Sequence, residues 1–122
     1  MAKLIVTDGI ALFKLSRVER YVLGRHYIAF ELDRILKVSV ENTPSRDELG
    51  QKTRYGWIPF TNTGEYQIGV KRSLFIGPNK ERCVRVLLLN PSFDELYVTS
   101  GDQFELYAIL KGHQSGALYS TD

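Results

Sequence analysis

The chain has 122 residues, of which 43% are hydrophobic and 25% charged, and this mix is typical of a globular domain rather than a disordered one. Sixteen basic and fourteen acidic residues give a net charge of +2, which is too low to recruit a polyanion by itself. The length fits one domain, and the single cysteine, Cys83, excludes a disulfide framework and favours a reducing compartment.

The first half of the chain predicts a hairpin, a short helix and two more strands. Residues 1–7 and 10–15 form apolar runs around Asp8-Gly9, a dipeptide typical of a two-residue hairpin turn. Ser16 and Glu19 have the spacing of a capping box and predict a helix over 17–23, which Gly24 would end. Residues 26–32 and 35–40 then alternate between apolar and polar side chains, which predicts two strands with one buried face each, joined by a turn at 33–34.

Residues 42–64 are the irregular part of the chain. The stretch 42–50 is rich in turn formers, and the segment Tyr55–Phe60 is an aromatic island that contains a glycine and a proline. A connection of this length is uncommon inside a compact domain and is often functional. The alternative is that part of it forms a further strand.

The second half returns to strand patterns and then changes to a helical period. Strands are expected over 64–70, 73–76, 83–89 and 95–99, with a turn at 77–80, and this regular spacing is typical of a sandwich or small barrel. Ser100 and Gln103 offer a second capping box, so we expect a helix over 101–111 that Gly112 ends. Residues 113–122 are expected to be a loosely held tail.

Two features argue against export or membrane insertion. The N-terminal residues lack the apolar core of a signal peptide. The longest apolar run, Val86–Leu89, is far shorter than the roughly 20 residues that a membrane-spanning helix needs. We therefore expect a cytoplasmic protein without a transmembrane segment.

Four stretches carry a resemblance to a known family: Val18–Tyr21 with Gly24, the two strands of 26–40, Tyr55–Pro59 with Gly64–Tyr66, and Tyr97–Phe104. Together they resemble the bacterial pleckstrin-homology-like (PH-like) proteins. The resemblance implies a mainly β fold, a partly open antiparallel barrel of about seven strands with a helix near 17–23 and a C-terminal helix near 101–111. It also implies a single domain over residues 1–112. Members of this superfamily use one barrel for lipid, peptide and protein ligands, some assemble into rings, and many have no assigned biochemistry.

The first hairpin bears on the lipid ligands of that superfamily. Members that bind phosphoinositides place several basic residues around this hairpin. Here only Lys3 and Lys14 flank it, and its tip carries the acidic Asp8. An inositol lipid is therefore not the expected ligand.

Residues that could carry catalysis are scarce. His26 alternates with apolar residues on an expected strand, where a core histidine is a simpler interpretation than a catalytic base, and His113 lies in the tail. The carboxylates of 47–48 and 94–95 are explained as loop charges, and Cys83 as a small buried hydrophobe. Two histidines and one cysteine are too few for a zinc site, and no phosphate-binding or dinucleotide-binding glycine motif occurs. We expect no catalytic residue, no metal and no cofactor.

The aromatic island is the best candidate for binding a partner. If its aromatic residues are exposed, they would form an apolar patch with a basic rim. Tryptophan, tyrosine and arginine are also common in the hot spots of protein interfaces. The candidate residues are Arg54, Tyr55, Trp57, Phe60, Lys71 and Arg72. The alternative is that Trp57 and Phe60 fold back as core.

The sequence thus predicts a non-enzymatic protein-binding or self-assembly module that docks through residues 54–60 or through an exposed sheet edge. The alternative function is anion or nucleic-acid binding. Between residues 46 and 85 eight basic residues face four acidic ones, a local charge of +4, which is either a solvated face or a site for phosphate. The basic residues of that site would be Lys71, Arg72, Lys80, Arg82 and Arg85. The low net charge of the whole chain disfavours nucleic acid.

Overall fold

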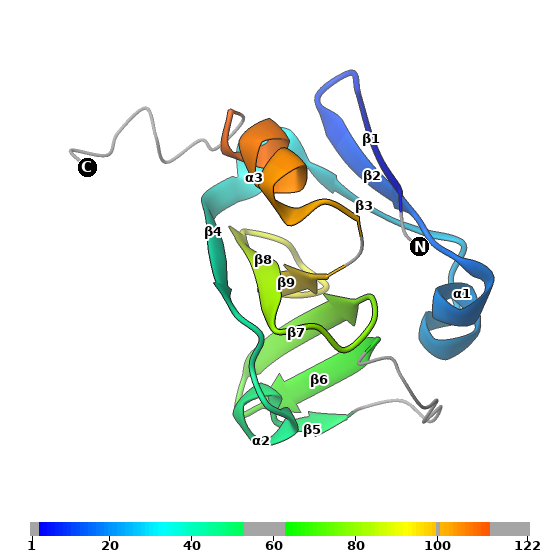
Figure 1. Cartoon of the computed structure of the whole chain (residues 1–122), viewed down its shortest axis with the longest axis vertical. Helices are drawn as coiled ribbons and strands as arrows, with labels where there is room; N and C mark the ends of the chain where they lie inside the picture. Colours follow the sequence, from blue (N-terminus) through cyan, green and yellow to red (C-terminus); the bar gives the residue numbers. More distant parts are fainter. Residues whose placement is uncertain (1–2, 53–62, 100, 113–122) are drawn as a thin grey trace.

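The computed structural model describes residues 3–52, 63–99 and 101–112, and it is mainly β (Figure 1). A three-stranded antiparallel sheet contains β1 (Lys3–Thr7), β2 (Ile10–Lys14) and β3 (Tyr27–Glu31), in that order. The expected hairpin is confirmed, because Asp8 and Gly9 have φ angles of 50° and 75°, which a type I′ turn requires.

The predicted short helix is confirmed as α1 (Arg17–Leu23), between β2 and β3. The Ser16 hydroxyl accepts a hydrogen bond from the Glu19 backbone N–H at 3.3 Å, and the Glu19 carboxylate accepts one from the Ser16 N–H at 2.9 Å. Gly24 ends the helix in the left-handed conformation, at φ 68°. The capping box and the glycine therefore account for both ends of this helix.

A six-stranded sheet forms the rest of the β structure, with the strand order β4-β8-β9-β7-β6-β5. After a single 3₁₀ turn, η1 (Leu32–Arg34), the chain enters β4, the first strand of this sheet. The six strands are β4 (Ile35–Asn42), β5 (Gln51–Lys52), β6 (Gly64–Ile68), β7 (Lys71–Ile76), β8 (Arg82–Leu88) and β9 (Glu95–Val98).

The mainly β class is confirmed, but the strand arrangement differs in two respects from the expected partly open antiparallel barrel of about seven strands. The strands of the described residues form two separate sheets and no closed barrel. In addition, β9 lies between β7 and β8 and pairs with β7 in parallel, with Ser73 opposite Glu95 and Ile76 opposite Val98. The turn at 77–80 therefore does not make a hairpin of β7 and β8, because β9 lies between these two strands in the sheet.

The irregular middle segment contains two short elements. A four-residue helix, α2 (Arg46–Leu49), begins after Ser45, whose hydroxyl accepts a hydrogen bond from the Glu48 N–H at 3.2 Å. The two-residue strand β5 then pairs with β6. Gly50 connects them at φ 96°, and a Cβ there would lie 2.4 Å from the carbonyl oxygen of Gln67. The alternative that part of this segment forms a strand is correct for 51–52.

The C-terminal helix, α3 (Gln103–Lys111), is confirmed, but its first turn differs from the expectation. Asp102, not Ser100, caps the helix: its carboxylate accepts hydrogen bonds from the N–H groups of Phe104 at 2.9 Å and Glu105 at 3.3 Å. In Figure 1, α3 lies between the β1–β2 hairpin and the β4 side of the larger sheet. Within the described residues, no helix has the length and apolar character needed to cross a membrane.

The main core fills the space between the two sheets and α3. Its buried side chains come from the inner face of the small sheet, from one face of the large sheet and from α3, and they include Phe13, Ile28, Phe30, Leu74, Ile76, Val84, Val86, Leu96, Leu106 and Leu110. Because side chains alternate along a strand, the neighbouring residues of β7, β8 and β9 point to the second face of the large sheet. That second face carries a cluster of charged side chains.

Candidate functional site

The predicted binding residues fall into two groups. Arg54, Tyr55, Trp57 and Phe60 lie outside the described residues, so the aromatic patch stays a prediction. Lys71 and Arg72 begin β7, and both are half-buried in contacts within the chain. The structure therefore places two of the six candidates, and it places them in ion pairs.

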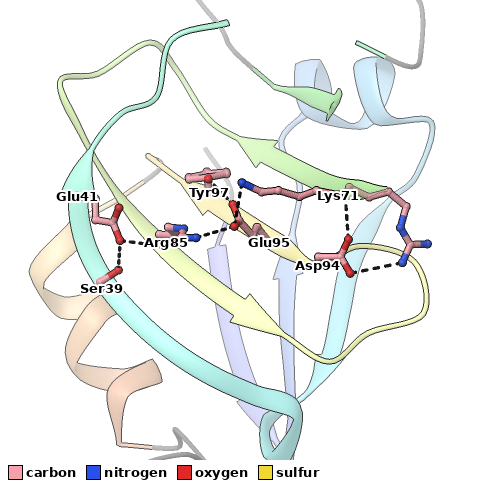
Figure 2. Close-up of polar contacts among 8 residues, drawn as sticks. Ser39, Glu41, Lys71, Arg85, Asp94, Glu95 and Tyr97 are labelled. Atoms are coloured by element: carbon pink, nitrogen blue, oxygen red, sulfur yellow. Dashed lines mark hydrogen bonds and ion pairs between the residues drawn. The ribbon is translucent and has the colours of Figure 1, made fainter. Parts of the chain in front are cut away.

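A network of charges centred on Glu95 occupies the second face of the large sheet (Figure 2). Glu95 begins β9, and its side chain is only 5% exposed. It accepts a hydrogen bond from Arg85 of β8 at 2.6 Å, lies 3.1 Å from the Nζ atom of Lys71 of β7, and accepts a short hydrogen bond from the Tyr97 hydroxyl. Side chains from three adjacent strands, β7, β8 and β9, thus contact the one buried carboxylate of Glu95.

A second carboxylate extends the network to the edge of the sheet. Glu41 of β4 lies 3.4 Å from the other terminal nitrogen of Arg85 and accepts a hydrogen bond from the Ser39 hydroxyl at 2.5 Å. Figure 2 shows the Arg85 side chain between the two carboxylates. Arg85 and Lys71 therefore balance Glu41 and Glu95 charge for charge.

The pKa values of these groups follow from the same contacts. Burial acts to raise the pKa of Glu95, but the hydrogen bonds from Arg85, Tyr97 and Lys71 outweigh burial and hold it below its ordinary value. The hydrogen bond to Glu95 raises the pKa of Arg85, and burial beside that carboxylate raises the pKa of Tyr97. These contacts therefore favour the ionised forms of Glu95 and Arg85 and the neutral form of Tyr97.

Arg72, at the edge of the network, is held by its own contacts with Asp94 and Pro91. Its backbone N–H donates to Asp94 at 2.9 Å, its guanidinium donates to the Pro91 carbonyl at 2.6 Å, and it pairs with Asp94 at 3.7 Å. Of the five basic residues proposed for an anion site, Lys71, Arg72 and Arg85 already face carboxylates. Lys80 and Arg82 are exposed.

An open cavity of about 680 Å³ lies beside α2, and Lys80 is one of the residues that line it. Asn42, Pro44, Glu48, Lys80 and Glu81 are among the residues that line it. Its one basic side chain is accompanied by two acidic ones, so the lining does not favour an anion.

The residues considered for catalysis are not brought together. His26 is exposed, not buried in the core as expected, and no carboxylate pairs with it within the described part of the chain. Cys83 is fully buried with Phe75 and Tyr97 in a small apolar cluster, and burial raises its pKa to about 11. Over residues 3–52, 63–99 and 101–112, no group of histidine, cysteine and carboxylate side chains could hold a metal ion.

The outer face of the small sheet carries partly exposed apolar side chains from all three of its strands. We call it the β1–β3 outer face. Its middle row consists of Ile5, Leu12 and Ala29, which lie opposite one another on adjacent strands. Ile5 is 44% exposed, Ile10 is 40% exposed and Tyr27 is 56% exposed. No strand pairs with the free edge of β1 among the described residues.

A groove of about 230 Å³ lies along β1 on the opposite side of the small sheet. Leu4, Phe13, Leu106 and Ile109 provide its apolar lining, and Lys3, Asp102 and Glu105 lie around it. Strand β1 therefore has apolar surface on both sides, and none of the described strands pairs with its outer edge.

The sequence patterns did not predict the Glu95 network, although the sequence holds a signal for it. Glu95 precedes Leu-Tyr-Val and Arg85 interrupts the apolar run of 83–89, and charged residues inside apolar strands usually need a partner. The interpretation of Glu95 as a loop charge was wrong, because it begins β9 and is buried.

Comparisons with known proteins identify no relative of this chain. No protein-family model matches it, and neither curated proteins nor solved structures include a match.

Proposed function

We propose that this chain is a non-enzymatic binding module that docks protein through the β1–β3 outer face and the free edge of β1. The PH-like resemblance and the lack of an assembled catalytic group in the described residues agree with that proposal. One observation carries it: an edge strand with exposed apolar side chains, Ile5 and Val6, has no strand beside it within the described part of the chain. Such edges accept another strand readily.

Edge strands are usually protected against pairing with another chain by charged side chains, an irregular register or short length. The edge strands of this protein differ in how far they carry these protections. Strand β4, at one edge of the large sheet, has an irregular register between Ile35 and Lys37 and carries the charged Lys37 and Glu41. Strand β5, at the other edge, has only two residues. Strand β1 has a regular register, no proline and a single charged residue, Lys3. It thus lacks the irregular register of β4 and the short length of β5, and unlike β3, the other edge of the small sheet, it exposes two β-branched apolar side chains, Ile5 and Val6.

Photo-crosslinking in cells tests the proposal and does not require the partner to be known. The photoreactive residue p-benzoylphenylalanine would replace Thr7, which is exposed on the β1–β3 outer face next to the free edge, or Val70, which is 93% exposed in the β6–β7 turn. We expect discrete protein adducts from position 7 and none above background from position 70. Equal yields from the two positions, or none from either, would refute the docking surface.

The anion-binding alternative has less support, because ion pairs engage three of its five basic residues. We expect weak retention on immobilised heparin that disappears at low added salt, since of these five residues only Lys80 and Arg82 are exposed and no ion pair involves them within the described residues. Elution of the chain would be followed across a salt gradient. Strong retention that Lys80→Ala and Arg82→Ala together abolish would instead favour the anion site.

A further inference from the structure

The backbone of the first hairpin determines which groups of β1 are free. Thr7 and Ile10 flank the two-residue turn and therefore form a hydrogen-bonded pair. Because hydrogen-bonded and non-hydrogen-bonded pairs alternate, Lys3 and Ile5 also bond to β2. Leu4 and Val6 consequently direct their N–H and C=O groups away from β2, to the free edge.

We propose that the strand docked on this edge is β1 of a second copy of the same chain, antiparallel to the first and related to it by a twofold axis at Ile5. This inference rests on the proposed function and names the partner. In this register Leu4 of each copy forms a hydrogen-bonded pair with Val6 of the other, so every outward N–H and C=O group of those two residues is satisfied. Ile5 meets Ile5 of the second copy at the axis.

The side chains suit this symmetric register on both faces of the sheet. On the outer face, Ile5 packs against its own copy, and Lys3 lies opposite Thr7 and beside the turn that carries Asp8. The two Lys3 residues are thereby kept apart, and each approaches an acidic group of the other copy.

On the inner face, Leu4 lies opposite Val6 of the second copy, at the mouth of the groove between β1 and α3. Val6 is 37% exposed in the single chain, so pairing covers an apolar side chain that the fold leaves in contact with water. Pairing of one five-residue strand buries less surface than a permanent dimer requires, so we expect an association that depends on concentration.

Charge exchange at Ile5 tests both the partner and the register. Ile5→Lys should raise the dimer dissociation constant about tenfold or more, because two lysines then meet at the axis, and Ile5→Glu should do the same. An equimolar mixture of the two variants should restore association, since lysine then faces glutamate. Val70→Lys, a change of the same kind at an exposed position outside the interface, should leave the constant unchanged. Sedimentation equilibrium over a wide range of concentration gives the constants of the wild type, the three variants and the mixture.

Several results would overturn the inference. They are a wild-type chain that stays monomeric at every concentration, an Ile5→Lys variant that dimerises like the wild type, and a mixture that fails to associate although circular dichroism shows both variants folded. If one variant does not fold, the other still decides between dimer and monomer. Crosslinks from position 7 to a different protein only would also overturn the second-copy partner while leaving the docking surface intact.

Discussion

Replacement of Glu95 by glutamine is expected to lower the free energy of unfolding by about 3 kcal/mol. The Glu95 side chain is 5% exposed, and its removal as a charge leaves the Arg85 guanidinium, only 23% exposed, with the more distant Glu41 as its counter-ion. Urea unfolding followed by circular dichroism at neutral pH measures the change. The matched control is Asp94→Asn, in the neighbouring pair with Arg72, whose side chains are 43% and 41% exposed, and it should cost less than about 1 kcal/mol.

The pH dependence of the same pair of proteins gives an independent check. Because the pKa of Glu95 is lower in the folded state, its ionisation stabilises the fold above the unfolded pKa, and this contribution is lost as the pH falls through the folded pKa. The difference between wild type and Glu95→Gln should therefore be full at neutral pH and shrink in acid. A difference that is equal for Glu95→Gln and Asp94→Asn, or that grows in acid, would contradict the network.

Gly50→Ala is expected to destabilise the fold by about 3 kcal/mol or more. The glycine has a φ of 96°, and an added Cβ would lie 2.4 Å from the backbone oxygen of Gln67 in β6. The matched control is Gly69→Ala, at φ 60° with no atom within 4 Å of the added Cβ, which should cost only about 1 kcal/mol. Thermal unfolding compares the two variants, and equal losses would show that α2 and β5 do not pack on β6 as described.

Local patterns predict the elements whose boundaries depend on neighbouring residues. The Ser16–Glu19 capping box and Gly24 determine α1, and period-two alternation identifies β3 and β4. Ser45 and Glu48 form an analogous box before α2, a helix too short to show an apolar period of its own. At α3, Ser100 and Asp102 offer competing caps two residues apart, and Asp102 holds the helix N–H groups.

Features that depend on strand order could not be predicted in this way. The parallel pairing of β9 with β7 joins residues about twenty positions apart, and no local pattern distinguishes it from a simple antiparallel succession. The Glu95 network depends on that order, because Lys71 and Arg85 reach the carboxylate from the strands on either side of β9. The sequence alone does not show how β9 is aligned with β7 and β8, so Lys71 and Arg85 were interpreted as residues that could bind an external anion.

The central claim, that the free edge of β1 accepts another strand, is tested most directly by amide hydrogen exchange at Leu4 and Val6, measured by nuclear magnetic resonance. We predict that both amides exchange rapidly at low protein concentration and become protected at high concentration, since their N–H groups point away from β2. The Ile5 amide, bonded to β2, should be protected at both concentrations. Exchange at Leu4 and Val6 that stays rapid at all concentrations, and in the presence of any partner captured at position 7, would contradict the claim.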